Sequence, residues 1–319
     1  MVFYRHMQTF NGTQSIKTPI PGSVVTLGNF DGVHLGHREL ISKAVASARS
    51  LGVPAVVFTF DPHPIQVLAP DRPFRRLFAI DDLKNVLPEL GVDVLVVEPF
   101  THEFARQAAE RFFEESLWAK LQPKQIVVGP DFAFGRDRSG DVGALTKFGT
   151  PLGVDVRVVP SVTLDGEAVS SSRIRQALVR GEVAEASRLL GRPFYVVGDV
   201  TSGAQRGRSL GFPTANIVPS NHTLSPRSGV YATKLCFGDQ CYPSVTNIGI
   251  NPTFQTSENL QPLSIETHIL DKDMNLYGKT VKIMFYSFLR EEKKFSSVEA
   301  LMQQIEGDIE VARELLKTL

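Results

Sequence analysis

The stretch Val24–Leu51, VVTLGNFDGVHLGHRELISKAVASARSL, joins a short apolar run to a helical pattern through a glycine-rich loop. Val24–Leu27 has the composition of a buried strand, and the apolar residues after the loop recur at helical spacing. Gly52 stands where such a helix is expected to end. A strand, a loop and a helix in this order direct free backbone N–H groups and the positive end of the helix toward a ligand above the sheet edge.

The same alternation continues through the first half of the chain. Further apolar runs predict buried strands at 55–60, 94–97, 126–128 and 154–159. An amphipathic helix is predicted between two of them, from Phe104 through Ala108 and Phe112 to Trp118. Because strands that are apolar throughout are buried on both faces, this half is predicted to be an α/β domain with a parallel sheet.

The pattern changes after two short helices, which are predicted at about 172–180 and 183–190. From Tyr195 onward, short β segments separated by Gly, Pro and Asn are predicted at 196–200, 214–218, 230–237, 241–248, 264–270 and 281–286. Such punctuation is typical of an antiparallel barrel or sandwich. The closing helix begins at Ser296-Ser-Val-Glu299, which fits a capping box. We therefore predict two domains, at 1–186 and 187–319.

The composition excludes several classes of protein. The 319 residues are 42% hydrophobic and 21% charged, which is typical of globular proteins and sufficient for two cores. The 34 basic residues balance 34 acidic ones, whereas a protein that binds nucleic acid through its phosphates usually has a basic excess. The sequence has neither an apolar run long enough for a membrane helix nor the pattern of a secretory signal. We expect a cytoplasmic protein without nucleic-acid or membrane partners; a homo-oligomer is left open.

The two cysteines, Cys236 and Cys241, flank a predicted two-residue hairpin turn at Gly238-Asp239. This turn would make the thiols neighbours across two strands. In a cytosolic protein we expect them to be reduced, as small buried strand residues rather than a redox pair.

Two histidines dominate the chemistry of the first half. His34 and His37 are three residues apart, so in a first helical turn both imidazoles can face the same phosphates and counter the charge of a leaving pyrophosphate, since they can be protonated near neutral pH. A solvated helix start or half of a metal site is the alternative, although this half shows no zinc-ligand spacing. We predict a nucleotide site that also includes Gly28, Asn29, Phe30, Asp31 and Gly36.

Three further segments are candidates for ligand contact in the first domain. Ser170–Arg175 combines serines suited to cap a helix with arginines that oppose its dipole unless an anion compensates, although a plain cap is the alternative. Two loops follow predicted strands and would lie at the ligand crevice of an open α/β sheet, unless they only pack locally. Their candidate residues are Phe60, Pro62, His63, Pro64, Asp131 and Phe134.

The second half holds a glycine- and arginine-rich segment followed by polar strand residues. Gly203, Arg206, Gly207, Arg208 and Gly211 suit a mobile flap over phosphates, and Pro213 follows them. Thr214 and Asn216 share one face of a predicted strand and offer oxygen, which Mg²⁺ prefers; a polar pair bonded to backbone is the alternative.

A carboxylate lies further along, in another apolar strand of the second half. Glu266 would be costly to bury without a partner, so we predict a general base; a solvent-facing residue is the alternative. Asn247 and Gly249 begin a structured loop that is expected to line the same cavity.

These motifs occur together in one known family. GNFDGVHLGH at 28–37, GPDFAFG at 129–135, SSSRIR at 170–175, GFPTAN at 211–216 and IETH at 265–268 occur in this order. The chain strongly resembles the prokaryotic bifunctional riboflavin kinase/FMN adenylyltransferases, also called FAD synthetases, over nearly its whole length. The Pro-Thr-Ala-Asn motif with the downstream glutamate is the most specific part of the resemblance.

The resemblance implies an N-terminal Rossmann-like adenylyltransferase and a C-terminal β-barrel kinase with a terminal helix. Riboflavin and ATP would give FMN, and FMN and ATP would give FAD and pyrophosphate, with Mg²⁺ accompanying ATP. In the first domain, His34 and His37 would bind ATP phosphates. They would be assisted by Ser171, Ser172 and Arg175, where the family commonly has threonine at Ser172.

In the second domain, the resemblance implies that Thr214 and Asn216 hold the Mg-nucleotide and that Glu266 deprotonates the ribityl hydroxyl of riboflavin. Arg290 resembles a residue of the family's flavin-side segment. Two other functions stay open from the residues alone. The first domain could transfer a nucleotide to another phosphorylated acceptor, or the chain could be a non-catalytic flavin-binding regulator that contacts RNA.

Overall fold

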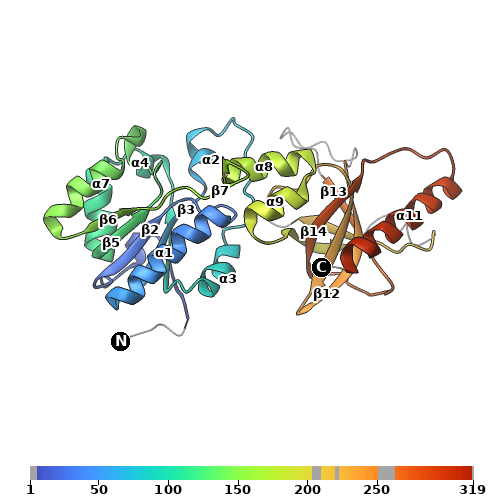
Figure 1. Ribbon diagram of the computed structural model, residues 1–319, viewed down its shortest axis with the longest axis horizontal. Helices are drawn as coiled ribbons and strands as arrows, with labels where there is room; N and C mark the ends of the chain where they lie inside the picture. Colours follow the sequence, from blue (N-terminus) through green and yellow to red (C-terminus); the bar gives the residue numbers. More distant parts are fainter. Residues whose placement is uncertain (1–5, 203–209, 220–222, 251–262, 318–319) are drawn as a thin grey trace. The chain divides into compact units, whose positions relative to one another are not determined.

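The computed structural model describes residues 6–202, 210–219, 223–250 and 263–317. The chain divides into two compact units, Met1–Ser170 and Ser171–Leu319 (Figure 1). The first unit is α/β, and the second is a β-barrel accompanied by helices, so the predicted fold class is confirmed. The functional boundary near residue 187 stays a prediction.

The first unit is built on a parallel sheet of six strands in the order β1-β4-β3-β2-β5-β6. Its strands are β1 (Gln8–Asn11), β2 (Ser23–Leu27), β3 (Ala55–Asp61), β4 (Val94–Pro99), β5 (Pro123–Val128) and β6 (Asp155–Val158). Sequence analysis missed β1, which pairs with β4 at the edge of the sheet. Its residues are mostly exposed, so it lacks the apolar run that identified the other strands.

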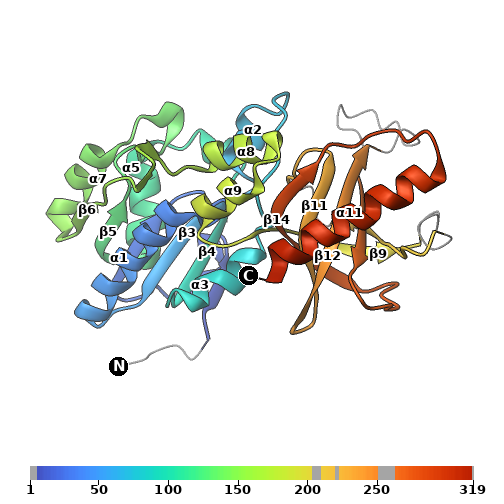
Figure 2. The same ribbon diagram turned by 45° about the vertical axis from the view of Figure 1, so that its right-hand side comes forward.

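Helices cover both faces of this sheet (Figure 2). On one face, α1 (Leu35–Leu51) and α3 (Asp82–Glu89) bury apolar residues, among them Ile41 and Leu87. On the other face lie η2 (Phe113–Trp118) and α7 (Val142–Gly149), with Leu117 and Leu145 in the core. As predicted, Gly52 ends α1, because it adopts the left-handed conformation with φ 63°.

The predicted helix from Phe104 to Trp118 is wrong as one continuous element. The structure divides this region into α4 (His102–Ala105), α5 (Ala109–Phe112), η2 and α6 (Ala119–Leu121). Ala108 is extended, with φ −62° and ψ 149°, and the Gln107 carbonyl accepts the Arg136 amide from a distant loop. The helical periodicity therefore continues across a break that a tertiary hydrogen bond stabilises. The remaining short elements of this unit are η1 (Thr13–Ser15), α2 (Pro64–Leu68), η3 (Arg136–Arg138), η4 (Thr150–Leu152), β7 (Thr163–Leu164) and β8 (Glu167–Ala168).

The second unit begins with α8 (Ser171–Arg180) and α9 (Val183–Leu190), close to their predicted bounds. A closed antiparallel barrel follows in the order β10-β13-β12-β11-β14-β9. Its strands are β9 (Phe194–Thr201), β10 (Ala215–Pro219), β11 (Gly229–Phe237), β12 (Gln240–Ile250), β13 (Leu263–Ile269) and β14 (Thr280–Arg290). This unit is therefore a closed barrel, whereas the pattern of short β segments alone was typical of either a barrel or a sandwich.

The terminal helix α11 (Val298–Lys317) lies along β11, β12 and β14 (Figure 2). Its buried Ala312 and Leu316 pack with Val230 of β11. The cap lies one residue later than predicted, because the Ser297 hydroxyl accepts the Ala300 amide at 3.2 Å. None of the helices in the described ranges is both long and apolar enough to cross a bilayer.

Cys236 and Cys241 lie directly opposite each other on β11 and β12, as the predicted turn requires, with Cα atoms 4.0 Å apart. Their sulfur atoms form a disulfide, so the expectation of reduced thiols is wrong for this structure. The hairpin brings the two cysteines into direct contact across the strands. The sequence predicted this contact, but it did not predict that the two sulfur atoms are bonded.

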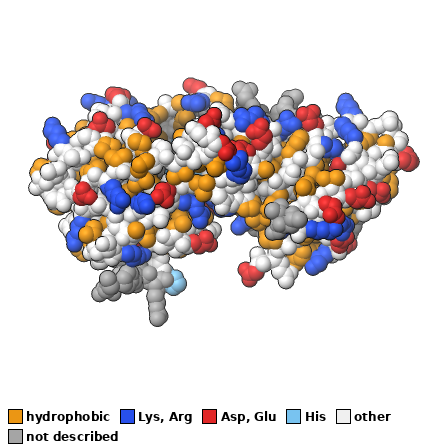
Figure 3. Space-filling model, in the orientation of Figure 1, with side chains coloured by type: hydrophobic (Ala, Val, Ile, Leu, Met, Phe, Trp, Pro, Cys, Tyr) orange, Lys and Arg blue, Asp and Glu red, His pale blue; other side chains and the backbone are white. Residues whose placement is uncertain are grey.

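Basic and acidic side chains are mixed over the visible face of the molecule, and neither sign gathers in one area. Figure 3 shows Lys and Arg interspersed with Asp and Glu on both units, as the zero net charge leads one to expect.

Candidate active sites

The glycine-rich loop of the first unit presents two imidazoles at the start of α1. His34 is the N-cap of this helix, and its Nδ1 accepts the His37 backbone N–H at 3.3 Å. The two rings stack with centroids 3.6 Å apart, and Phe30 meets the His37 ring edge-on at 5.3 Å. The histidines therefore lie together, as their spacing predicted.

Burial, together with the neighbouring His34, holds the pKa of His37 well below its ordinary value. His37 is therefore neutral at pH 7 without a ligand, contrary to the expectation that it is readily protonated. The phosphates of ATP would favour the charged form and raise this pKa.

We accordingly predict that a non-hydrolysable ATP analogue raises the pKa of His37. A pH titration of the histidine ring signals by NMR measures this pKa with and without the analogue, and His37→Gln assigns the resonance. The exposed His102 serves as an internal reference, because its ring signals are expected to be the same with and without the analogue. An unchanged pKa of His37 at saturating analogue would contradict the placement of phosphates beside this ring.

The side chains of two other residues predicted for this site make their contacts inside the protein. The Phe30 side chain is fully buried in the core, and the buried Asp31 carboxylate accepts the Leu77 amide at 2.9 and 3.2 Å. Both could contact a nucleotide only through their backbone. A side chain at Gly36 would place its Cβ 3.2 Å from the His34 ring, so glycine keeps room for that imidazole.

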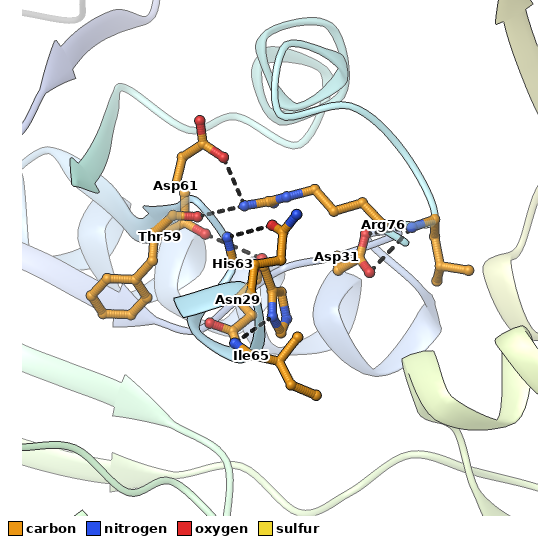
Figure 4. A network of polar contacts seen from close by, with 10 residues as sticks. Asn29, Asp31, Thr59, Asp61, His63, Ile65 and Arg76 are labelled. Carbon is orange, nitrogen blue, oxygen red and sulfur yellow. Dashed lines mark hydrogen bonds and ion pairs between the residues drawn. The ribbon is translucent and has the colours of Figure 1, made fainter. Parts of the chain in front are cut away.

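The residues predicted around the loop after β3 span three elements: Phe60 lies near the end of β3, Pro62 and His63 form the loop, and Pro64 begins α2. His63 caps α2: its Nδ1 accepts the Ile65 amide at 3.3 Å, and its own N–H donates to the Gln66 side chain (Figure 4). The Asp61–Pro62 peptide bond is cis, and Phe60 packs edge-on against Phe58 and Phe100. His63 thus shapes this loop, and its ring lies on Phe74 at 4.4 Å.

The loop after β5 divides its predicted residues between surface and core. Asp131 is exposed, whereas Phe134 is buried against Phe112 and Phe132. Gly135 has φ 72°, and a Cβ there would lie 2.7 Å from the Ala109 Cα, so the turn requires glycine. Phe134 therefore anchors the loop in the core, and its ring has little accessible surface for stacking on a flat ligand.

Sheet topology brings these three loops to one edge. Strands β3, β2 and β5 are neighbours and parallel, so the loops that follow them emerge at the same carboxyl end, with the histidine loop in the middle. This edge is the usual ligand site of an open α/β sheet. The motifs were visible in the sequence, and the strand order places them together.

The predicted anion-binding serines lie in the first turn of α8, in the second unit. Ser172 is exposed and Arg175 is half-buried. Arg173, in the same turn, pairs with Glu185 of α9 at 2.6 Å, so a carboxylate compensates this arginine. The contacts of Ser171, Ser172 and Arg175 with ATP stay predictions.

In the second unit, three polar residues form a row across adjacent strands. Glu266 of β13 lies directly opposite Asn216 of β10 on one side and Asn247 of β12 on the other. Directly paired residues share a face of the sheet, so these side chains lie side by side. The Ser264 hydroxyl donates to Glu266 Oε1 at 3.3 Å.

A cavity of about 530 Å³ opens beside this row. Thr214, Asn247, Glu266 and Arg290 are among its lining residues. Thr214 precedes β10 instead of lying within it, and it also lines a second cavity of about 290 Å³. Thr214 and Glu266 thus share one cavity, which is what a common site for a phosphate donor and an alcohol acceptor requires.

Sequence reasoning missed several residues of this region. His268 lines the larger cavity, and its Nδ1 lies 2.8 Å from the Pro213 carbonyl, so it holds the segment before Thr214. Its position two residues after Glu266 on a strand could have indicated a common face. The smaller cavity is lined in part by Lys272, Asn275 and Tyr277, which no local pattern singled out.

Arg290 is held by a partner on the terminal helix. Asp308 is buried and accepts from Arg290 Nε at 2.9 and 3.0 Å and from Nη2 at 2.7 Å. Asn247 Nδ2 donates to Glu292 at 3.2 Å, and a Cβ at Gly249 would lie 2.8 Å from the same carboxylate. Asn247 and Arg290 therefore line the larger cavity, and Gly249 lies beside Glu292, which also lines it.

The oxygen donors around Thr214 suit Mg²⁺. A hydroxyl and an amide oxygen are ligands that a hard cation accepts, and ATP phosphates would complete the shell. Within the described residues, no cluster of three or more His, Cys, Asp or Glu could hold a metal without such help. Gly203, Arg206, Gly207 and Arg208 lie outside the described residues, and Gly211 and Pro213 lie just before Thr214.

Comparison with known proteins assigns a family to each part of the chain. Residues 16–173 match the family model described as FAD synthetase. Residues 190–316 match the model described as riboflavin kinase.

Whole-length relatives match both parts together. The chain is 37% identical over 310 residues to the bifunctional riboflavin kinase/FMN adenylyltransferase of Escherichia coli K12, which covers 97% of each protein. It is 37% identical to the Bacillus subtilis enzyme of the same description, over 92% of each. A crystal structure from Streptococcus pneumoniae described as a macrolide-efflux protein shares the fold, with a TM-score of 0.88 and 35% identity over 96% of this chain and 98% of that one. With both parts of the chain matched, and with relatives of this description aligned over nearly their whole length, the chain belongs to the bifunctional riboflavin kinase/FMN adenylyltransferase family.

Proposed function

We infer that this protein builds FAD from riboflavin in two ATP-dependent steps, one at each site. The second unit phosphorylates riboflavin to FMN, and the first unit transfers an adenylyl group from ATP to FMN and releases pyrophosphate. The observation that carries this inference is the presence of two separate polar groups in a chain that both family models match. One is a histidine pair at a helix start. The other lies on the barrel, where Thr214 and Glu266 share a cavity and Asn216 pairs with Glu266.

In the kinase step, Glu266 accepts the proton of the terminal ribityl hydroxyl. The hydroxyl oxygen then forms a bond to the γ-phosphorus of ATP, and the bond from that phosphorus to ADP breaks. Thr214 and Asn216 would hold Mg²⁺, which when bound supplies positive charge against the phosphates. Asn216 lies directly opposite Glu266, which supports a site where base and phosphoryl donor flank the hydroxyl.

In the adenylyl step, a phosphate oxygen of FMN attacks the α-phosphorus of ATP, and pyrophosphate leaves. His34, His37 and the N-terminus of α1 counter the charge that accumulates on the leaving group. Gly28, Asn29 and Gly36 allow close approach of the nucleotide, and Ser171, Ser172 and Arg175 assist at its phosphates.

The flavin ring is assigned to two separate surfaces. In the first unit it lies at the loop of Phe60, Pro62, His63 and Pro64 and near Asp131. In the second unit it occupies the larger cavity, near Asn247, Gly249 and Arg290. Both reactions consume ATP, which supports a cytoplasmic location.

A product assay tests the whole proposal. Purified protein with riboflavin, ATP and Mg²⁺ is expected to yield first FMN and then FAD, resolved by chromatography, and a chelator is expected to stop FMN formation. FMN without FAD would show that the first unit serves another acceptor. Tight flavin binding without ATP turnover would instead indicate a regulator.

A further inference from the structure

Two consecutive residues in the connection between α2 and α3 contact both loops of the adenylyltransferase site. The Leu77 amide donates to the Asp31 carboxylate in the histidine loop. Arg76 Nη2 donates to the Phe60 carbonyl and to Asp61 Oδ1, both at 2.9 Å, at the end of β3 where the next loop begins. Figure 4 shows the Arg76 side chain reaching across to Asp61, while the Asp31 carboxylate lies near the backbone end of Arg76.

Most of these groups are sheltered from solvent. The Arg76 side chain is 11% exposed, and Asp31 and Leu77 are buried, whereas the Asp61 side chain is 44% exposed. Because the guanidinium itself is largely removed from water, its hydrogen bond to the Phe60 carbonyl holds the backbone more firmly than a fully exposed arginine would. A third link joins β3 directly to the histidine loop, from the Thr59 hydroxyl to the Asn29 carbonyl at 3.2 Å.

We propose that Arg76 is a positioning residue for adenylyl transfer. It fixes the loop after β3, here called the FMN loop, relative to the histidine loop at the start of α1, here called the ATP loop. Arg76 and Leu77 are adjacent, so their bonds to the two loops are separated by about one residue of chain, roughly 3.8 Å. A displacement of one loop is thereby transmitted to the other. This inference rests on the proposed assignment of ATP to the histidine loop and FMN to the loop after β3.

The chemistry explains why such a connection matters. In-line attack requires the FMN phosphate oxygen and the α-phosphorus of ATP at near-contact distance, and a misplacement of about 1 Å can cost on the order of a hundredfold in rate. The guanidinium bonds a carbonyl and a carboxylate with one nitrogen. A lysine, whose ammonium is a strongly hydrated point charge on a flexible stem, would reproduce this arrangement only in part.

The test uses Arg76→Met and Arg76→Lys in the full-length chain, with FAD formation from supplied FMN as the readout. For Arg76→Met we expect kcat/KM for FMN to fall about tenfold to a hundredfold, mainly through a higher KM for FMN, while KM for ATP changes much less. Arg76→Lys is expected to recover part of this loss. FMN formation from riboflavin is expected to be unchanged in both, which shows that the second unit is folded, and the nearly constant KM for ATP shows the same for the first unit.

Arg111→Met is the matched control, because Arg111 is an exposed arginine of the same unit whose partner is Glu115. It is expected to leave FAD formation unaltered. An unchanged KM for FMN in Arg76→Met would overturn the positioning inference. So would an equal rise in the KM values for FMN and ATP, since that result would show general loosening of the unit.

A separate variant distinguishes failure of this inference from failure of the proposed function. Phe60→Leu alters the FMN loop itself without touching the Arg76 side chain. If Phe60→Leu raises KM for FMN and Arg76→Met does not, only the positioning inference fails. If neither variant affects KM for FMN, the assignment of FMN to this loop is wrong as well.

Discussion

Glu266→Gln is expected to abolish FMN formation from riboflavin while leaving FAD synthesis from supplied FMN intact. Glutamine has nearly the same shape as glutamate, so it keeps the packing between Asn216 and Asn247, but it cannot accept the hydroxyl proton. Loss of a general base typically lowers the rate about 10²- to 10⁴-fold. Separate assays of the two half-reactions, with riboflavin or with FMN as the starting flavin, measure the effect.

The matched control for this substitution is Glu310→Gln, which removes an exposed carboxylate from the helix that packs on the same barrel. It is expected to leave both reactions unchanged. Kinase activity in Glu266→Gln within a few-fold of the unaltered protein would exclude Glu266 as the base. The row of polar residues would then have another purpose, such as holding the nucleotide.

His37→Ala is expected to have the opposite effect, so that FMN is made and accumulates without conversion to FAD. The imidazole stacks on His34 at the N-terminus of α1, where it would oppose the charge of the departing pyrophosphate. Removing one such preorganised group typically costs about 10²- to 10³-fold in rate. The ratio of FMN to FAD formed from riboflavin, followed over time by chromatography, measures this loss.

Two comparisons make the result interpretable. His37→Gln keeps a polar side chain of similar reach, and it separates loss of the imidazole from loss of packing against Phe30. His102→Ala removes an exposed histidine from the same unit and is expected to have no effect. If either Glu266→Gln or His37→Ala silenced both reactions in a folded protein, the two sites could not be independent.

The features that sequence analysis predicted correctly depend on residues close together in the chain. The strand, loop and helix around His34 and His37 are defined within about 30 residues, because apolar periodicity and glycine placement are local signals. The same holds for the hairpin between Cys236 and Cys241 and for most of the barrel strands. The continuous helix to Trp118 fails because a distant amide, that of Arg136, ends the helical hydrogen bonding near Gln107.

The residues that sequence analysis missed act through partners far along the chain. Arg76 contacts a carbonyl 16 residues earlier, and Asp308 binds Arg290 across the turn into the terminal helix. No sequence pattern singles out either residue, because arginine in a loop and aspartate on a helix are common at protein surfaces. Only their burial beside a specific partner distinguishes them.

The amino-acid sequence by itself determined the two kinds of domain, the histidine pair and the Thr–Asn and Glu motifs. Each of these features can be identified from residues that are close together in the chain. Only the tertiary structure decided which of these motifs meet. The strand order places three loops at one sheet edge, and the barrel register sets Glu266 between Asn216 and Asn247. Pairing between distant strands depends on how whole faces pack together, and no short stretch of sequence contains that information.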